Sequence, residues 1–123
     1  MAALTQGNYP GDWLIEEFGA PHYCREEKIL ASGQDCVTGT VVANNSGTVS
    51  PFIHDDGTYG TPYGILLNDV DASTGAKACV VLVRGPAVVA SGKLFYHADN
   101  DSAEVIIGNA ALLALGIVGR EGV

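Results

Sequence analysis

The stretch Lys77-Ala-Cys-Val-Val-Leu-Val-Arg-Gly-Pro-Ala-Val-Val89 is the longest apolar, β-branched run in a chain that glycine otherwise interrupts. Residues 79–83 are consecutive apolar residues rich in valine, too few for a typical helix, and they predict a strand buried on both faces. Gly85 and Pro86 then predict a bend, because proline has no amide hydrogen to donate to an interior ladder. The extended direction resumes at Ala87. Since a sharply bent strand needs partners from both sides of the sequence, we expect a small β fold built around this run.

The composition is typical of one compact, β-rich domain. The 123 residues include 16 glycines, and 47% of them are hydrophobic and 16% charged, which indicates tight turns around one modest core rather than disorder. Fourteen acidic and six basic residues give a formal net charge of -8. This charge repels phosphate backbones and releases no counterions on contact, so we expect no nucleic acid among the partners.

The sequence predicts neither secretion nor a membrane span. The first residues lack the basic segment and the long apolar segment of a signal peptide. The apolar run 110–118 is well short of the roughly 20 residues that cross a bilayer. We therefore expect a soluble protein that is made in the cytoplasm of a cell and has no membrane partner.

The rest of the chain predicts further short strands and one helix. Apolar and β-branched runs separated by Gly, Asn and Pro are typical of strands in a small barrel, and we expect them at 23–30, 36–43, 49–53, 62–67 and 117–118. A turn of Asn and Gly at 44–47 predicts a hairpin, because these residues tolerate positive φ. The expected fold class is mainly β with one short helix, arranged as a small β barrel.

The helix is predicted over residues 102–115. Asp101 is the predicted N-cap, and Glu104, three residues later, completes a capping box. Gly116 is expected to end the helix. Five apolar residues fall roughly on one helical face, which we expect to pack on the barrel: Val105, Ile106, Ala110, Leu112 and Leu113.

Residues 1–22 differ in character from the remainder of the chain. Glycine and proline punctuate them at Gly7, Pro10, Gly11, Gly19 and Pro21. We therefore expect 1–22 to form an extended N-terminal arm and 23–123 to form a single domain. Trp13 begins the one strongly apolar patch of the arm. It either fills a pocket on a partner or packs on its own domain, and the sequence leaves both open.

Residues suited to catalysis or metal binding form few clusters. Imidazole and carboxylates occur together at 54–56 (His-Asp-Asp) and at 97–101 (His-Ala-Asp-Asn-Asp). Neither spacing matches a defined metal motif, and we interpret both as solvated acidic loops. Cys24, Cys36 and Cys79 match no zinc signature, so we expect three reduced thiols. Because nucleophile-elbow and phosphate-loop motifs are also missing, we expect no enzymatic activity, no metal and no cofactor.

Six stretches of the chain together carry a family resemblance. They are Pro10-Gly-Asp-Trp-Leu-Ile-Glu-Glu17 and residues 32–41, 63–67, 68–72, 80–88 and 112–118. In order and spacing they resemble the head decoration (cementing) proteins of tailed bacteriophages, of the lambda type. The likeness covers most of the chain. It departs at Gly119, where a further strand residue is usual, so it does not fix the length of the last strand.

The resemblance implies a β-clip fold and a homotrimer on the outer capsid surface of the virion. The trimer is expected at three-fold and quasi-three-fold positions of the expanded shell, which it stabilises against internal genome pressure. The resemblance also implies that the arm contacts the major capsid protein of the same phage. Because an extended arm can add a strand to a neighbour's sheet edge, we expect the contact to use Tyr9, Pro10, Gly11, Asp12, Trp13 and Leu14.

Two other functions stay open at the level of sequence. One is a trimeric β-clip hydrolase with a metal-dependent site at the subunit interface, built from Asp69, Asp71 and Arg84. The other is a host-adhesion module displayed on the capsid. Saturable binding of a small ligand would favour the hydrolase, and tighter binding to host cells than to empty shells would favour the adhesion module.

Overall fold

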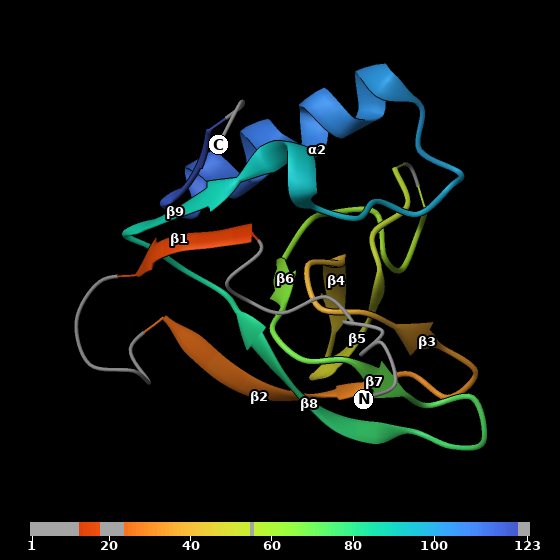
Figure 1. Ribbon diagram of the computed structural model, residues 1–123. Helices are drawn as coiled ribbons and strands as arrows, with labels where there is room; N and C mark the ends of the chain where they lie inside the picture. The colour runs from red at the N-terminus through yellow and green to blue at the C-terminus, as the bar shows by residue number, and fades with distance from the viewer. Residues whose placement is uncertain (1–12, 18–23, 55, 121–123) are drawn as a thin grey trace, which may run out of the picture.

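The structure, a computed structural model, describes residues 13–17, 24–54 and 56–120 (Figure 1). Its centre is a closed barrel of five strands in the order β2-β5-β4-β6-β8. The barrel strands are β2 (Arg25–Leu30), β4 (Val41–Asn45), β5 (Thr48–Pro51), β6 (Gly64–Leu66) and β8 (Lys77–Leu82). With one α-helix among the described residues, this barrel confirms the predicted fold class, mainly β with one short helix.

A second sheet and the helix lie together at one end of the barrel, at the top of Figure 1. The sheet has the order β1-β9-β10, and β9 runs antiparallel to β1 and parallel to β10. A two-stranded ribbon pairs β3 with β7. The bounds of these elements are β1 (Leu14–Glu17), β3 (Asp35–Cys36), β7 (Val70–Asp71), β9 (Ala87–Ala90), the 3-10 helix η1 (Ser91–Lys93), α2 (Ser102–Ala114) and β10 (Ile117–Arg120).

The central run joins the barrel to the second sheet, as the sequence predicts. In β8, Val81 packs in the barrel interior and Leu82 packs in the cluster beneath the sheet and helix, because successive side chains of a strand point to opposite faces. The chain bends at Gly85 and Pro86, which are joined by a cis peptide bond. A Cβ at Gly85 would lie 1.8 Å from the carbonyl oxygen of Gly116. Glycine is therefore required where the bend meets the turn before β10.

Two apolar clusters form the core. The first lies inside the barrel and draws on all five barrel strands through Leu30, Val42, Val49, Leu66 and Val81. The second fills the space between the barrel, the β1-β9-β10 sheet and α2, and its largest members are Trp13, Phe52, Ile65, Leu82, Leu112 and Ile117. The sheet and the helix thus share a core with the barrel, so they form one domain with it.

All five predicted strands differ from the structure at one or both ends, and two of these differences have a clear physical reason. The strand expected at 36–43 is divided, because β3 ends at Cys36 and β4 begins at Val41. Gly39, between them, has a φ of 91°, a left-handed conformation that interrupts an extended strand. The last strand continues past 118 to Arg120, because Gly119 and Arg120 pair with Val89 and Ala90 of β9.

The predicted helix is confirmed, but its predicted inward face is wrong. The Asp101 carboxylate accepts a hydrogen bond from the backbone N–H of Glu104 (2.8 Å), and the Glu104 carboxylate accepts one from the Asp101 N–H (2.9 Å). Ile106 and Leu113, expected to be buried, are 69% and 57% exposed. The buried helix residues are Gly108 and Leu112. No helix among the described residues has the length and apolar character needed to cross a membrane.

The ring of Tyr96 explains why the inward face of α2 contains a glycine. A Cβ added to Gly108 would lie 2.6 Å from Tyr96 Cε1, so the ring occupies the space of a side chain. The Tyr96 hydroxyl donates a hydrogen bond to Asn109 Oδ1 (2.6 Å). The helix is thus held against the barrel end by an aromatic side chain from the preceding loop together with its own Leu112, which is 2% exposed.

Candidate functional site

Trp13 fixes the beginning of the described chain to the body of the protein. Its indole is 1% exposed and belongs to the core between the barrel, sheet and helix. The indole Nε1–H donates a hydrogen bond to Thr38 Oγ1 (2.9 Å), and the Thr38 hydroxyl donates to the Leu67 carbonyl (2.9 Å). The polar atom of this large side chain is therefore satisfied inside the core, as buried indoles require.

The loop between β3 and β4 is shaped around the Trp13 ring. At Gly39, with its left-handed φ, an added Cβ would lie 3.1 Å from Trp13 Cδ1. The backbone N–H of Thr38 donates to Asp69 Oδ1 (2.8 Å), and that of Gly39 donates to the Leu66 carbonyl (2.8 Å). The loop therefore has hydrogen bonds to β6 and the following turn that hold it over the indole.

Strand β1 follows Trp13 and forms one edge of its sheet. Leu14 pairs with Val89 and Glu16 with Val88, with a register shift between them. Ile15 is 50% exposed. Edge strands have backbone groups available to an added strand, and β1 is such an edge among the described strands of its sheet.

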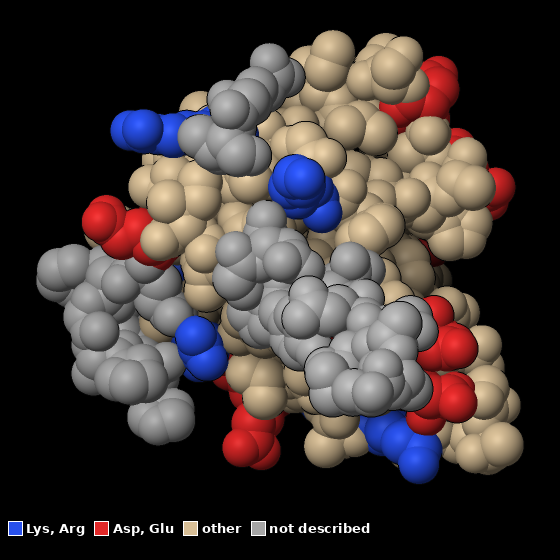
Figure 2. All heavy atoms as spheres, in the orientation of Figure 1, with Lys and Arg blue, Asp and Glu red and all other residues tan. Residues whose placement is uncertain are grey.

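Charges of both signs are interspersed over the barrel. In Figure 2 acidic and basic side chains surround the lower part of the molecule, whereas most of the surface over α2, at the top, is neutral. Glu26 on β2 contacts Lys28 Nζ (3.0 Å), Arg84 and the Tyr63 hydroxyl (3.1 Å). Hydrogen bonds first from Lys28 and then from Arg84 hold the pKa of Glu26 below its usual value.

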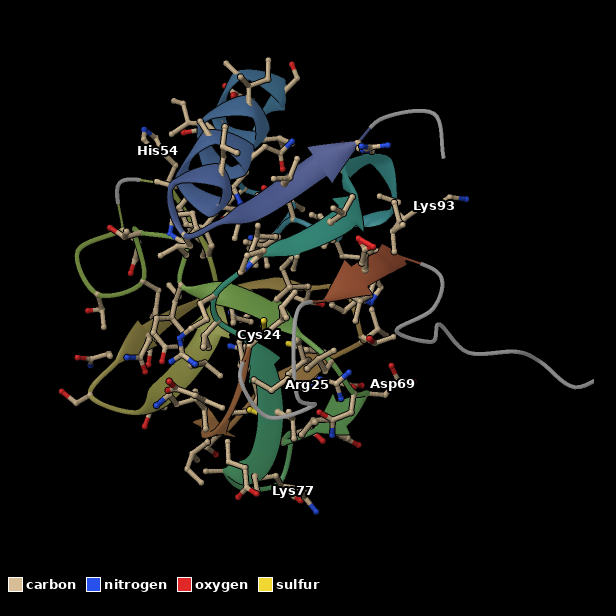
Figure 3. All side chains as sticks on the ribbon, turned by 90° about the vertical axis from the view of Figure 1, so that its left-hand side faces the viewer. Cys24, Arg25, His54, Asp69, Lys77 and Lys93 are labelled. Carbon is tan, nitrogen blue, oxygen red and sulfur yellow. The ribbon has the colours of Figure 1, made fainter. Side chains whose placement is uncertain are left out.

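The side chains that could suggest a metal or catalytic site accept hydrogen bonds from nearby backbone N–H groups instead. Asp56 accepts hydrogen bonds from the N–H groups of Thr58 (3.0 Å) and Tyr59 (2.7 Å). His97 Nδ1 accepts one from the Asp99 N–H (3.1 Å). Over the described ranges, no three His, Cys, Asp or Glu side chains are grouped to hold a metal ion. Figure 3 shows His54, Asp69 and Lys77 at three separate places on the molecule.

The three cysteines are buried thiols that form no disulfide. Cys24 lies inside the body in Figure 3 and is 0% exposed. Burial, with smaller contributions from Asp35 and Cys79, raises the pKa of the Cys36 thiol to about 11. A thiol with so high a pKa stays protonated near neutral pH, so it has little of the thiolate character that nucleophilic chemistry needs.

Comparison with known protein families identifies the chain. A model of the bacteriophage lambda head decoration protein D family matches residues 3–117. The chain belongs to this family. It is a phage head decoration protein, a structural component of the virion capsid. A search of curated protein sequences found no match.

The expected capsid-binding residues of this decoration protein fall into three groups. Tyr9, Pro10, Gly11 and Asp12 lie outside the described residues. Trp13 lies in the core of its own domain, which supports the second of the two alternatives for this residue and leaves its ring no free face for a partner. Leu14 is half-buried on β1. Residues 13–17, which the sequence places in the arm, therefore contribute to the domain.

The residues considered for a hydrolase have separate partners. Asp69 accepts from the Thr38 N–H, and Asp71 accepts from both the N–H (3.0 Å) and the hydroxyl of Ser73. Arg84 donates to Glu26. Asp69 and Asp71 thus stabilise turns of the decoration protein, and Arg84 contributes to the ion cluster on the barrel.

Thr38 and Gly39 are the functional residues that sequence reasoning missed. They hold Trp13, and with it the point where the N-terminal segment joins the body. A Thr-Gly pair inside a strand-like run of 36–43 is a signal for an interruption, since glycine in a strand often marks a bulge or a close approach. Nothing in the local sequence indicates that the approaching group is an indole 25 residues earlier.

Proposed function

We propose that this decoration protein binds the outer surface of the expanded capsid as a homotrimer, at three-fold and quasi-three-fold positions, and stabilises the shell against internal genome pressure. The observation that carries the proposal is the family match over residues 3–117. The body supports a mechanical role: one apolar cluster joins barrel, sheet and helix, the cysteines are buried, and Asp56, Asp71 and Asp101 accept hydrogen bonds that stabilise turns and a helix cap. We further propose synthesis in the host cytoplasm.

The arm is the proposed contact with the major capsid protein of the same phage. Residues Tyr9 to Asp12 stand directly before Trp13, whose buried indole ties the arm to the body. Proline and glycine in this segment favour an extended path that can add to a sheet edge of the shell. In this proposal Trp13 anchors the arm in the domain, and the residues that precede it contact the major capsid protein.

Trimerisation and mass action account for the stabilisation. A trimer presents three arms at once, so individually weak contacts become strong when the spacing of sites on the shell matches their reach. A ligand that binds only the intact expanded shell shifts the equilibrium away from ruptured forms, because those forms lose the binding free energy. The negative net charge of -8 repels the phosphate backbone of DNA, so it disfavours binding of the free protein to DNA before the protein binds expanded shells.

The proposal is tested by sedimentation with expanded, undecorated shells. The wild-type chain and a variant lacking residues 1–12 are mixed with expanded and with unexpanded shells, and circular dichroism confirms that both proteins are folded. We expect the wild type to sediment with expanded shells only, and the shortened chain to stay in solution. Full binding by the shortened chain would refute the arm contact, and no binding by the wild type would refute the function.

A further inference from the structure

A hollow of about 250 Å³ lies between the β3–β4 region and residues 95–97, which precede α2. Figure 1 shows β3 at the right of the barrel, below the segment that leads into α2. The side chains that decide the chemistry of the hollow are Gln34, Asp35, Val37, Phe95 and His97. They come from two distant parts of the sequence and combine an aromatic ring with polar groups. A concave site of this mixed composition is where a small ligand is expected to bind.

The ring of Phe95 is the exposed aromatic surface of the hollow. Phe95 is 44% exposed, and the neighbouring apolar residue Val37 is 37% exposed. The backbone beneath the ring is fixed, because the Phe95 N–H donates to the Gly39 carbonyl (2.9 Å) and the Phe95 carbonyl accepts from the Val41 N–H (2.9 Å). An aromatic ring on a fixed backbone provides a flat apolar surface on which another ring can stack.

The polar side chains of the hollow have hydrogen-bonding groups to spare. Neither the Gln34 nor the Asp35 side chain has a hydrogen bond to another described residue. The carboxylate of Asp35 only accepts, whereas the amide of Gln34 both accepts and donates. His97 Nδ1 accepts from the Asp99 N–H (3.1 Å), so the neutral ring holds its proton on Nε2 and donates there. The hollow therefore offers both acceptors and donors to a ligand.

The charge around the hollow disfavours charged ligands. Asp35 is paired across the β3–β7 ribbon with Asp71, and no lysine or arginine is among the described residues that line the hollow. Anions are therefore repelled. A quaternary ammonium ion favours a cage of several aromatic faces. The second ring at the hollow, Tyr96, instead packs beside Gly108 and donates to Asn109.

The size of the hollow limits the ligand to about one ring. Its volume of about 250 Å³ is below the roughly 300–1,000 Å³ of pockets that hold drug-sized molecules. The ligand that fits is thus uncharged, has one flat apolar face, and carries several groups that donate and accept hydrogen bonds. A pyranose ring has these properties, because one face presents C–H groups and its rim presents hydroxyls.

We propose that this hollow is a binding site for a neutral sugar. The C–H face of a pyranose ring stacks on Phe95, and its hydroxyls hydrogen-bond to Gln34, Asp35 and His97. The carboxylate of Asp35 has two oxygens and accepts from two neighbouring hydroxyls, and the Nε2–H of His97 donates to a hydroxyl oxygen. The site gives the molecule a second activity besides its structural one: recognition of a sugar-bearing surface.

Display in many copies makes such a weak site effective. A shallow site for one sugar ring binds with a dissociation constant on the order of 1 mM. Many copies on one particle bind a surface of repeated sugars far more tightly, because every contact after the first is intramolecular. This step, unlike the site itself, rests on the proposed function.

The site is tested by nuclear magnetic resonance titration of the isotope-labelled full chain. The neutral probes are the methyl glycosides of glucose, galactose, mannose and N-acetylglucosamine, and the charged probes are choline and sialic acid. Phe95→Ala removes the stacking surface, and Asp35→Asn removes the charge of the acceptor at similar size. Ile29→Ala is the matched control, because Ile29 is 43% exposed and lies on β2, outside the lining of the hollow. Circular dichroism confirms that each variant is folded.

We expect at least one neutral glycoside to shift the amide signals of residues 34–40 and 95–97 and to saturate them. Phe95→Ala should weaken binding about tenfold, Asp35→Asn should weaken it roughly fivefold, and Ile29→Ala should leave it unchanged. The inference is overturned if no neutral glycoside gives saturable shifts or if the shifts lie elsewhere. It is also overturned if choline or sialic acid binds the hollow more tightly than the glycosides, or if Phe95→Ala binds like the wild type.

A second measurement tests the role on the particle. Shells decorated with the wild-type chain should be retained on agarose that carries the bound glycoside, and shells decorated with Phe95→Ala should pass through. Equal retention of the two kinds of shell would overturn that role. Because the titrations use the free protein, their failure leaves shell binding, and with it the proposed function, unaffected.

Discussion

Replacing Trp13 by alanine tests whether this residue belongs to the domain or to a partner contact. The indole is 1% exposed and its Nε1–H is bonded to Thr38, and removal of a buried tryptophan of this kind costs about 3–5 kcal/mol. That loss is a large part of the roughly 5–15 kcal/mol that stabilises a typical domain. We expect the urea midpoint to fall by roughly 2 M. Ile15→Ala, on the same segment but at a residue 50% exposed, should change stability by only about 0.5 kcal/mol.

Intrinsic fluorescence offers a direct readout, because Trp13 is the one tryptophan of the chain. In the free protein we expect blue-shifted emission that iodide does not quench, and no change when expanded shells are added. Red-shifted, quenchable emission that moves to the blue only on shell binding would refute the placement of Trp13 in the core. So would a Trp13→Ala variant that keeps wild-type stability while losing shell binding. Midpoints are compared at equal protein concentration, since association contributes to apparent stability.

Contacts in the body support three further predictions. Gly108→Ala should destabilise the protein by about 1–3 kcal/mol in chemical denaturation, because the new Cβ meets the Tyr96 ring at 2.6 Å; an unchanged midpoint would contradict this packing. Cys36, whose pKa is raised to about 11, should resist alkylation at pH 8 until urea unfolds the chain, and rapid labelling of the native protein would show that it is accessible. The lowered pKa of Glu26 stabilises the fold above pH 4.5 and ceases to do so as the pH falls through the folded-state value, so Glu26→Gln should flatten the acid side of the stability profile measured by thermal melting; parallel profiles would contradict the role of Lys28.

The parts of the fold that depend on local chemistry could be predicted from the sequence. The capping box of Asp101 and Glu104 is a short-range signal, and both of its hydrogen bonds form. The bend at Gly85 and Pro86 is also a local signal, because the two residues that form it are adjacent in the sequence. The central strand could be identified because its apolar residues pack in two different clusters, which is what an uninterrupted apolar run indicates.

The parts that depend on distant residues could not be predicted. The interruption of the predicted 36–43 strand at Gly39 lies where the Trp13 ring packs against the backbone. A contact between residues so far apart in the sequence leaves no local sequence pattern. The predicted inward face of α2 is wrong because a helix that is apolar all round has no periodicity to choose between its sides. The ring of Tyr96 makes that choice by filling the space beside Gly108. The arm residues Tyr9 to Asp12 stay a sequence-based proposal.

Imaging of expanded, undecorated phage shells before and after mixing with the purified full-length chain is the decisive experiment for the proposed function. We expect added density on the outer surface at every three-fold and quasi-three-fold position, in a shape that three copies of the barrel, sheet and helix fill. Shells that look the same with and without the protein would contradict the proposed function, as would added density at other positions or on the inner surface.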